Sequence, residues 1–370
     1  MKIGLVIYGS LDTVSGGYLY DRKIVEHLRR QGDQVEVLSL PRRNYVRHLG
    51  DNFSSDLRRR IEAGGFDLLI EDELNHPSLF WLNHKIKARL PYPIVSIVHH
   101  LRSSEARPAL ENRLYRQVEK RYLRSVDAFI FNSEATRRTV ESLTGMQATS
   151  VIAHPAGNQL NPAVTQAEVR SRAYKPGPLR LLFLGNVISR KGIHILLQSL
   201  DRIRNQDWTL SIVGSLQADP GYARSIRRQS TRLELEDRVE FLGALPADEL
   251  ARRMCCSHLL VVPSFHEGFG IAYLEGMGFG LPAIATTGGG AAEIITHGEN
   301  GFLAPPGDPE ALAAQLHRVL GDRDLLASLS LAALRRYEQQ PTWQETAEQV
   351  RDFLLLLVNT NSTDKIRSKA

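Results

Sequence analysis

Short apolar runs alternate with helical patterns along almost the whole chain, and this alternation constrains the fold more than any other feature. Runs such as Lys2–Tyr8 and Ile94–Val98 are typical of strands buried on both faces of a sheet. Residues 18–31 have one apolar side, as in an amphipathic helix. The alternation predicts an α/β fold with parallel sheets. Strands are predicted at residues 2–8, 34–38, 67–70, 94–98, 128–132 and 150–153, and at 180–185, 209–213, 239–242, 258–262, 282–286 and 301–303.

The alternation is interrupted once, at residues 171–178, where two prolines and a glycine stand beside polar residues. Such a segment is typical of a linker. A length of 370 residues also suits two domains of ordinary size. We therefore expect two Rossmann-like domains with a cleft between them. The predicted division is residues 1–172, a linker at 173–179, a second domain at 180–340, a helix at 341–358 that packs back on the first domain, and a frayed polar tail at 359–370.

Composition excludes several classes of protein. Hydrophobic residues make up 42% of the chain and charged residues 24%, as in soluble globular proteins. The two cysteines are the neighbours Cys255 and Cys256, which argues against a disulfide framework or a metal site. The apolar start is too short for a signal peptide, and no run approaches the ~20 apolar residues of a membrane span. A cytoplasmic protein is the expectation.

Positive charge is concentrated in the first half. Residues 1–175 hold 26 Lys and Arg against 19 Asp and Glu, whereas the remainder holds 20 against 22. Either an anionic partner, such as a membrane surface, or an ordinary charged surface would explain this. Residues 101–125 combine seven cations with interleaved apolar residues. Such a helix either lies on an anionic bilayer, peripheral to the membrane, or packs on its own domain. Nucleic acid is not expected as a partner, because no stacking platform or known motif is present.

Two glycine turns follow predicted strands. The first, ending in Gly16 and Gly17, does not match the dinucleotide fingerprint, which argues against a nicotinamide or flavin cofactor. It either brings backbone N–H groups to an anion or is only a tight turn. The second runs from Gly185 to Arg190 and Lys191, two cations at the start of a helix. That combination suits a diphosphate, although two surface cations could also occur there by chance.

Residues 258–293 form a strand–loop–helix corner with two carboxylates. Glu267 lies in the loop with Gly268 and Gly270, and Glu275 lies in the second turn of the helix that follows. A second strand then leads to a run of three glycines and Glu293. The corner stands at the carboxyl end of a sheet, where ligands bind in open α/β folds.

These motifs together resemble those of the retaining nucleotide-sugar glycosyltransferases of family 4, also called glycosyl transferases group 1. That family has the GT-B fold, two facing Rossmann-like domains with parallel sheets and an interdomain cleft. The matching residues cover most of 180–310 in the expected order. They are Gly185, Lys191-Gly192, Phe241-Leu242-Gly243, Pro263-Ser264, Glu267-Gly268-Phe269-Gly270, Glu275, Gly280-Leu281-Pro282, Gly288-Gly289, Glu293, Asn300-Gly301 and Pro306-Gly307-Asp308. The first half matches more loosely, through Gly16-Gly17, His99 and Asn132-Ser133-Glu134.

The resemblance implies roles for these residues. Glu275 would accept hydrogen bonds from both ribose hydroxyls, since a carboxylate has two oxygens for a vicinal diol. Glu267 would lie near the transferred sugar, and Lys191 would neutralise the leaving nucleoside diphosphate. The backbone of Gly268, Phe269 and Gly270 would hold the sugar hydroxyls and the diphosphate. The loop after Leu242 and Gly243 would flank the nucleobase. His99 would form a hydrogen bond with the donor sugar or its phosphate.

The chain departs from the family pattern at one position. The family has an arginine directly after the glycine of the strand, and this chain has Asn186. We expect Arg190 to compensate. His99 is favoured over His100 because it aligns with the family histidine and because alternate residues face opposite sides of a strand. A histidine at a strand end is otherwise more often structural.

Two acidic segments remain outside the motif set. Asp322-Arg-Asp324 has the D-x-D form of a metal site, but it is far in sequence from the other motifs and no metal is expected there. The segment Glu71-Asp72-Glu73 follows a predicted strand in the first half. It could line an acceptor pocket, and a solvated loop is the simpler expectation.

The sequence therefore predicts a retaining, metal-independent hexosyltransferase without cofactor. It would use a nucleoside-diphosphate sugar, UDP being the expected nucleotide, and a glycan or lipid hydroxyl as acceptor. Two alternatives stay open. One is another GT-B enzyme, a sugar-nucleotide 2-epimerase or a phosphorylase; the other is a non-catalytic subunit of a glycan assembly complex.

Overall fold

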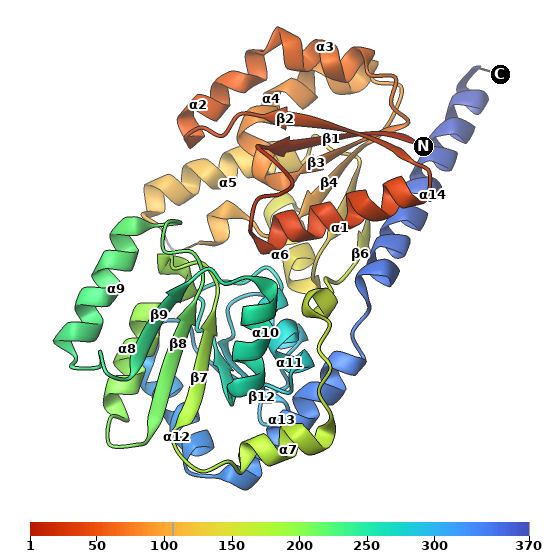
Figure 1. The fold of residues 1–370 in the computed structure, drawn as a ribbon. Helices are drawn as coiled ribbons and strands as arrows, with labels where there is room; N and C mark the ends of the chain where they lie inside the picture. The colour runs from red at the N-terminus through yellow and green to blue at the C-terminus, as the bar shows by residue number, and fades with distance from the viewer. Residues whose placement is uncertain (106, 370) are drawn as a thin grey trace. The chain divides into compact units, whose positions relative to one another are not determined.

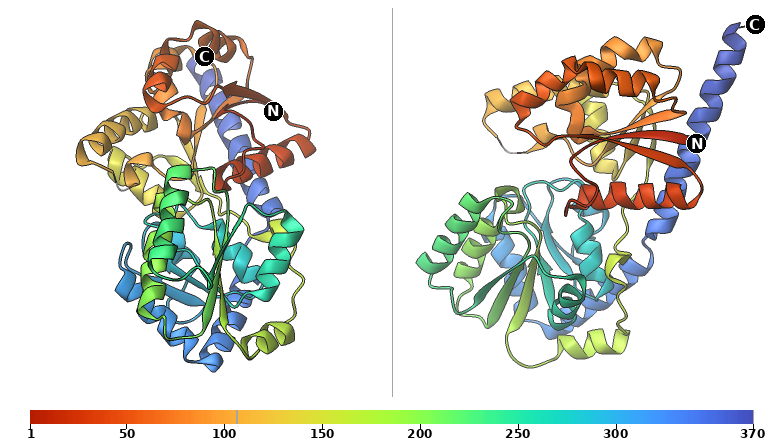
Figure 2. Two further views of the ribbon diagram at one scale, coloured as in Figure 1. Left: turned by 60° about the vertical axis from the view of Figure 1, so that its left-hand side comes forward. Right: turned by 45° about the horizontal axis from the view of Figure 1, so that its top comes forward.

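A computed structural model describes residues 1–105 and 107–369, with side chains to residue 361. The chain forms two compact units, Met1–Pro155 with Pro341–Ala370, and Ala156–Gln340. Helices cover both faces of the sheet in each unit (Figures 1 and 2). Within the described range, no helix is both long and apolar enough to cross a bilayer.

The boundary between the units differs from the expected linker at 173–179, because the preceding segment packs in the second unit. Arg172 donates hydrogen bonds to the carbonyl oxygens of Phe279 and Gly280, at 2.7 and 2.9 Å. Val169 packs where a side chain at Gly280 would otherwise stand. The prolines and glycine of 171–178 therefore form a turn inside the second unit, between helix α7 (Gln166–Ala173) and strand β7 (Leu179–Leu184).

The first unit contains a six-stranded parallel sheet in the order β2-β1-β3-β4-β5-β6. The central strands β3 and β4 are buried along their whole length, which explains their largely apolar sequences. The exceptions are Glu71 and Asp72 in β3 and Ser96 in β4. The strands are β1 (Lys2–Tyr8), β2 (Gln34–Leu40), β3 (Leu68–Asp72), β4 (Ile94–Val98), β5 (Ala128–Phe131) and β6 (Thr149–Ile152).

Some helices of the first unit begin at side-chain caps. Ser15 and Ser133 cap α1 (Gly16–Arg30) and α6 (Glu134–Thr144) by accepting a backbone N–H. Helix α14 (Trp343–Lys369) packs against α1. It continues through the predicted polar tail as far as Lys369, and Ala370 lies outside the described residues. The other helical elements are α2 (Tyr45–Leu49), η1 (Gly50–Phe53), α3 (Ser55–Ala63), η2 (Glu73–Asn75), α4 (His76–Ile86), η3 (Lys87–Arg89), η4 (Arg102–Ser104) and α5 (Ala109–Leu123).

The second unit contains a six-stranded parallel sheet in the order β12-β11-β10-β7-β8-β9. Every strand predicted from the sequence is present, so the α/β prediction is confirmed. The remaining strands are β8 (Trp208–Val213), β9 (Val239–Gly243), β10 (Leu259–Val261), β11 (Ala283–Thr286) and β12 (Gly301–Ala304). The helical elements are η5 (Asn158–Leu160), α7, η6 (Ser189–Lys191), α8 (Ile193–Arg202), α9 (Pro220–Arg232), α10 (Ala247–Cys256), α11 (Ile271–Gly278), η7 (Gly290–Glu293), α12 (Pro309–Leu320) and α13 (Arg323–Glu338).

Candidate active site

Strand order indicates where each unit can bind a ligand. The order reverses between β1 and β3 in the first sheet, and between β7 and β10 in the second. Ligands of open α/β sheets bind outside the carboxyl ends of the strands at such a reversal. In the second unit these ends lead to the segments that contain Lys191 and Glu267. In the first unit they lead to Gly17 and Asp72.

The second unit brings Arg190, Lys191 and Glu267 together. The Lys191 Nζ lies 2.5 Å from Glu267 Oε1, and the Arg190 Nη1 lies 3.7 Å from Glu267 Oε2. The Ser264 hydroxyl donates to Glu267 Oε1 at 2.5 Å. The Arg190 guanidinium also donates to the carbonyl oxygen of His266 at 2.6 Å. Two cations thus share one carboxylate, and the cluster keeps a net positive charge suited to an anionic ligand.

The pKa values show why this cluster is charged. Burial alone would raise the pKa of Glu267, but the adjacent Lys191 and Arg190 outweigh burial and lower the pKa to about 2. Burial lowers the pKa of Lys191, an effect that Glu267 opposes and Arg190 reinforces. Glu267 is therefore a carboxylate at neutral pH and an acceptor of hydrogen bonds.

The glycines after β11 hold the Glu267 loop by close backbone contact. The Glu267 N–H donates to the Gly288 carbonyl oxygen, and the Gly290 N–H donates to the Glu267 carbonyl oxygen, both at 2.9 Å. Gly289 has φ +92°, and a Cβ there would overlap the Glu267 carbonyl oxygen. These glycines thus hold the Glu267 backbone in place, and this fixes the position of its carboxylate. The motif order predicted their presence, but only the structure shows this contact.

Helix α11 places Glu275 in its second turn, as predicted. The Glu275 side chain is partly buried. Its carboxylate has no hydrogen-bond or ion-pair partner among the residues with described side chains. Burial raises the pKa of Glu275 to about 7. A partly buried carboxylate without a protein partner is ready to accept hydrogen bonds from a ligand.

The other donor-binding residues predicted in the second unit lie at the same sheet edge, whereas Gly16 and Gly17 begin α1 in the first unit. Gly185 and Asn186 follow β7 directly, and Leu242 and Gly243 end β9. The backbone carbonyl oxygen of Gly243 accepts a 2.8 Å hydrogen bond from the Gly214 N–H. The loop residues Gly268, Phe269 and Gly270 connect β10 with α11, and the Phe269 side chain is buried.

In the first unit, His99 contacts the glycine turn and a buried carboxylate. Its Nε2 lies 3.0 Å from Asp21 Oδ1, and a Cβ at Gly17 would stand 3.1 Å from its Cδ2. The His99 Nδ1 has no hydrogen-bond partner among the residues that the structure describes. Burial lowers the pKa of His99, but Asp21, Asp72 and Glu73 outweigh burial and raise it to about 9. His99 is thus a protonated imidazolium whose Nδ1–H can donate a hydrogen bond to a ligand. His100 differs, since its Nε2 lies 3.2 Å from Glu105.

Asp21 is a site residue that sequence reasoning missed. It lies in α1, far from His99 in sequence, and its spacing carries no motif. An acidic residue one turn into a helix that opens with Gly16-Gly17 was the available signal. Its side chain is buried, which for a carboxylate requires a charged partner.

The expectation of a solvated loop at Glu71-Asp72-Glu73 is wrong. All three side chains are buried, because β3 continues through Asp72 and η2 begins at Glu73. Burial raises the pKa of Glu71 to about 7 and those of Asp72 and Glu73 to about 8. The segment thus consists of three buried carboxyl groups whose raised pKa values favour their protonated forms near neutral pH.

Two groups that include residues of this segment have the spacing of a metal site: Asp21 with Asp72 and His99, and Glu73 with His76 and Glu119. Some of their donor atoms already have protein partners: His99 Nε2 faces Asp21, the Tyr45 hydroxyl lies 3.1 Å from His76 Nε2, and the Ser103 N–H donates to Glu119. Asp21 Oδ2, Asp72 Oδ2 and Glu73 Oε1 are buried without a hydrogen-bond partner among the described residues. Both groups are therefore hydrogen-bonded networks that are only partly satisfied.

The D-x-D segment has structural roles. Asp322 caps α13 by accepting the Leu325 N–H at 2.8 Å. Asp324 accepts a 2.6 Å hydrogen bond from the Tyr174 hydroxyl. Both carboxylates thus serve the packing of α13 and the segment after α7.

Comparison with known proteins gives the class of protein. Residues 165–336 match Glycosyl transferases group 1, and residues 20–157 match Glycosyltransferase Family 4. The chain belongs to this family of glycosyltransferases, which makes it a transferase enzyme. The predicted family and the two-domain GT-B fold are thereby confirmed.

Individual relatives differ in what they transfer. The chain is 29% identical to the D-rhamnosyltransferase WbpZ of Pseudomonas aeruginosa, over 69% of this chain and 68% of that protein. It is 27% identical to the phosphatidyl-myo-inositol mannosyltransferase of Mycobacterium leprae, over 95% of both. It is 30% identical to the D-inositol 3-phosphate glycosyltransferase of Jonesia denitrificans, over 49% of this chain and 44% of that protein. Several of the matched relatives are thus spanned over only about half of their length.

Solved structures share the fold. The sucrose-phosphate synthase of Thermosynechococcus elongatus superposes with a TM-score of 0.81 at 22% identity, over 97% of this chain and 99% of that one. Anabaena HepE in complex with UDP-glucose superposes with a TM-score of 0.75 at 21% identity, over 96% and 100%.

Proposed function

We propose that the protein is a retaining, metal-independent glycosyltransferase that moves a hexose from a nucleoside-diphosphate sugar, with UDP as the nucleotide, to a hydroxyl acceptor. The observation that carries the proposal is the cluster of Arg190, Lys191 and Glu267 at the strand-order reversal of the second unit. UDP is supported by its presence in the HepE complexes, and a hexose by the rhamnosyl and mannosyl relatives.

Donor binding is assigned to the second unit. Glu275 would accept hydrogen bonds from both ribose hydroxyls, because its carboxylate has no protein partner among the residues with described side chains. Arg190 and Lys191 would contact the diphosphate. The backbone of Gly268, Phe269 and Gly270 would hold the sugar hydroxyls, and the β9 end at Leu242 and Gly243 would flank the nucleobase. The acceptor, a glycan or a lipid, would meet the first unit.

The proposed reaction breaks the bond between the anomeric carbon and the diphosphate oxygen. Negative charge grows on that oxygen, and Arg190 and Lys191 stabilise it because Glu267 and the backbone already hold them in place. The acceptor hydroxyl attacks from the same face and gives its proton to the leaving diphosphate. No carboxylate among the described residues is assigned as a nucleophile, and Glu267 is engaged by Lys191. His99 would donate from Nδ1 to the donor sugar or its phosphate.

The cationic pair also bears on metal and location. Two fixed side-chain cations can supply the charge that a divalent ion supplies elsewhere, so the proposal needs no metal or cofactor. A cytoplasmic enzyme that works at the inner face of a membrane would suit nucleotide-sugar supply and the basic first half.

The test is a nucleotide-sugar panel, scored by thermal shift and then by nucleoside-diphosphate release with glycan and lipid acceptors. Lys191→Ala and Arg190→Ala should each lower kcat by about 10²–10³-fold, the loss typical of removing one transition-state donor. Arg202→Ala, an exposed cation on α8, is the control and should keep full activity.

Other outcomes contradict the proposal. Product formed from nucleotide sugar alone would indicate an epimerase, and a requirement for inorganic phosphate would indicate a phosphorylase. Donor binding without turnover would indicate a non-catalytic subunit. Near-normal kinetics for Arg190→Ala would show that it does not replace the arginine missing at Asn186.

A further inference from the structure

One contiguous surface of the first unit holds a large surplus of cations. Residues 41–60 and 76–89 hold nine Arg and Lys against two Asp, and they form α2, η1, α3, α4 and η3. These elements pack on one another around α4. Both acids are occupied: Asp51 is buried and bound to Arg43 at 3.0 Å, and Asp56 lies 2.7 Å from Arg59.

Neighbouring acids neutralise only some of these cations. Glu62 pairs with Arg58 and Arg89, and Asp127 pairs with Lys87. By contrast, the side chains of Arg47, Arg60 and Lys85 have no acidic partner within the described part of the chain. The charge that this surface presents outward is therefore positive.

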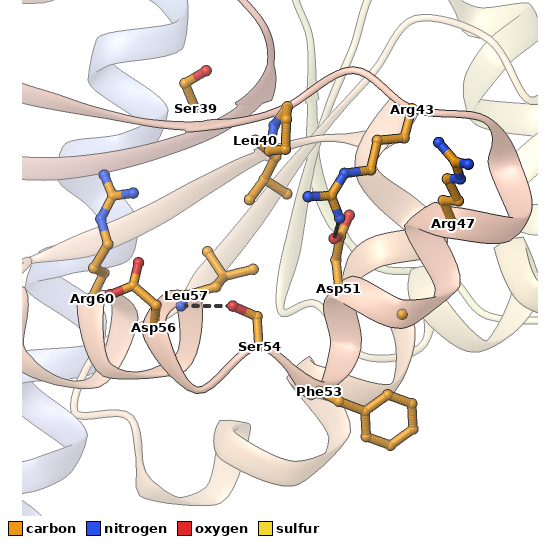
Figure 3. Close-up of a pocket in the computed structure, with 12 residues that line it drawn as sticks. Ser39, Leu40, Arg43, Arg47, Asp51, Phe53, Ser54, Asp56, Leu57 and Arg60 are labelled. Atoms are coloured by element: carbon orange, nitrogen blue, oxygen red, sulfur yellow. Dashed lines mark hydrogen bonds and ion pairs between the residues drawn. The ribbon is translucent and has the colours of Figure 1, made fainter.

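Arginines of this surface line a cavity of about 460 Å³. Arg43 and Arg60 lie on opposite sides of Leu57 in the close-up, and Arg47 stands beyond Arg43 (Figure 3). The cavity lies against the end of edge strand β2. Ser54 lines it as well, and its hydroxyl accepts the Leu57 N–H at the start of α3. Asp51 and Asp56 line the cavity too, but Asp51 pairs with Arg43 and Asp56 with Arg59. The guanidinium groups of Arg47 and Arg60 therefore remain for a phosphate.

Large apolar side chains project beside the cavity. Val46 is 74% exposed and Phe53 is 73% exposed. Trp81 is 41% exposed. The Lys85 Nζ lies over both aromatic rings, 5.2 Å from the centroid of Phe53 and 5.6 Å from that of Trp81. Apolar side chains flanked by Lys and Arg are typical of surfaces that rest in the headgroup region of a bilayer.

The predicted basic helix is a weaker candidate for the same role. Helix α5 buries Tyr115, Val118 and Tyr122 against its own unit, as the packing alternative required. Leu110 and Leu114 remain exposed, at 83% and 53%. However, Arg107, which precedes the helix, is bound by Glu105 and Glu111.

We propose that Val46, Arg47, Phe53, Arg60, Trp81 and Lys85 form a basic-aromatic face that docks on an anionic lipid bilayer, with a lipid phosphate in the arginine-lined cavity. The apolar side chains enter the boundary between headgroups and acyl chains, and the cations bind lipid phosphates around them. This inference goes beyond the transfer reaction, since it assigns a partner to a surface that the reaction does not use.

The test is sedimentation of the full-length protein with vesicles of phosphatidylcholine alone or mixed with phosphatidylglycerol, without nucleotide sugar. The protein should bind the anionic vesicles only, and binding should vanish near ~1 M NaCl, where the Debye length falls to ~3 Å. The double variant Arg47→Ala/Arg60→Ala should bind at least about 10-fold more weakly, since each cation near the surface contributes roughly a factor of 5. The variant Val46→Ser/Phe53→Ser should also lose binding.

The matched control is Leu110→Ser/Leu114→Ser, which removes an equal number of exposed apolar side chains from α5 and should bind normally. Loss of binding in this control with retention in Val46→Ser/Phe53→Ser would overturn the proposal. So would a wild-type protein that ignores anionic vesicles or binds neutral ones equally. Displacement from vesicles by inorganic phosphate, at an ionic strength matched with NaCl, would reveal a soluble-anion site instead. Unchanged melting temperatures and unchanged nucleoside-diphosphate release separate lost docking from lost folding or lost catalysis.

Discussion

At the scale of single residues, the position of charge distinguishes groups of the same chemical type. Glu267 and Glu275 lie eight residues apart, yet neighbouring cations lower the pKa of Glu267 to about 2, and burial raises that of Glu275 to about 7. The spacing predicted two carboxylates at one corner. The difference between them depends on which cations approach in three dimensions, which spacing does not encode.

Substitution of Glu275 should separate ligand binding from stability. Glu275→Gln should weaken binding of nucleoside diphosphate by about 10-fold or more, because hydrogen bonds to a charged group are worth roughly 1.5–3 kcal/mol. Without ligand the variant should be as stable as the wild type or more stable. A raised carboxyl pKa lowers stability as pH rises from the unfolded pKa, 4.5, through about 7, so the advantage should appear across that window.

Calorimetric titration and melting curves from pH 4 to pH 8 measure both quantities. The exposed Glu299→Gln variant serves as the control for charge removal in the same unit. Normal nucleotide affinity in Glu275→Gln would remove the ribose role.

Asp21 should set the pH range in which His99 is charged. Asp21 from α1, Asp72 from β3 and Glu73 from η2 face the imidazole and keep its pKa near about 9. The wild-type kcat/KM should therefore fall as pH rises through about 9. In Asp21→Asn the fall should move down by about 1–3 pH units, because one adjacent opposite charge is lost.

The pH profile of kcat/KM is the measurement, and Glu26→Gln, an exposed acid on the same helix, is the control. A structural role alone would lower activity without moving the profile. An unchanged profile in Asp21→Asn would therefore refute the positioning role of this residue.

At the scale of elements, buried parallel strands were the most predictable part of the fold. Strands such as β4 are buried on both faces, so their sequences are apolar at nearly every position and their places in the chain can be predicted directly. The segment Glu71-Asp72-Glu73 was misassigned because acidic side chains are mostly exposed in proteins, whereas all three of these are buried. The position of His99 was predicted, but its partner Asp21 was not, because Asp21 is distant from it in sequence.

The contact between the glycine turn after β11 and the Glu267 loop should be essential. In Gly289→Ala the added Cβ would overlap the Glu267 carbonyl oxygen, so both the free energy of unfolding and kcat should fall, the former by roughly 3 kcal/mol. Gly298→Ala is a matched control, because Gly298 also has positive φ, +83°, but open space around it. It should cost only about 1–2 kcal/mol of backbone strain and leave kcat unchanged. Equal losses in both variants, by urea unfolding and turnover, would show that strain alone matters.

At the scale of the whole molecule, the chain forms two units with separate cores. Leu354 in α14 is fully buried in the first unit, and the residues proposed to bind UDP lie in the second. Leu354→Ala should lower the free energy of unfolding of the first unit by about 2–5 kcal/mol, and with it the melting temperature of that unit. UDP should raise only the melting temperature of the second unit. Differential scanning calorimetry measures both. A single transition that responds to both changes would show that the units melt together.

The place of α14 also has a consequence for synthesis on the ribosome. Residues 156–340 form an uninterrupted unit, whereas the first unit needs both its opening 155 residues and the segment from Pro341 onward. During translation, α1 emerges long before α14, which packs on it. The ion pair between Asp33 and the Arg351 guanidinium, 2.7 Å apart in the folded chain, can form only after α14 has emerged. The unit whose synthesis begins first is therefore the last to complete its folding. Until α14 has emerged and folded, the face of α1 that α14 will cover is exposed to chaperones, proteases and neighbouring nascent chains.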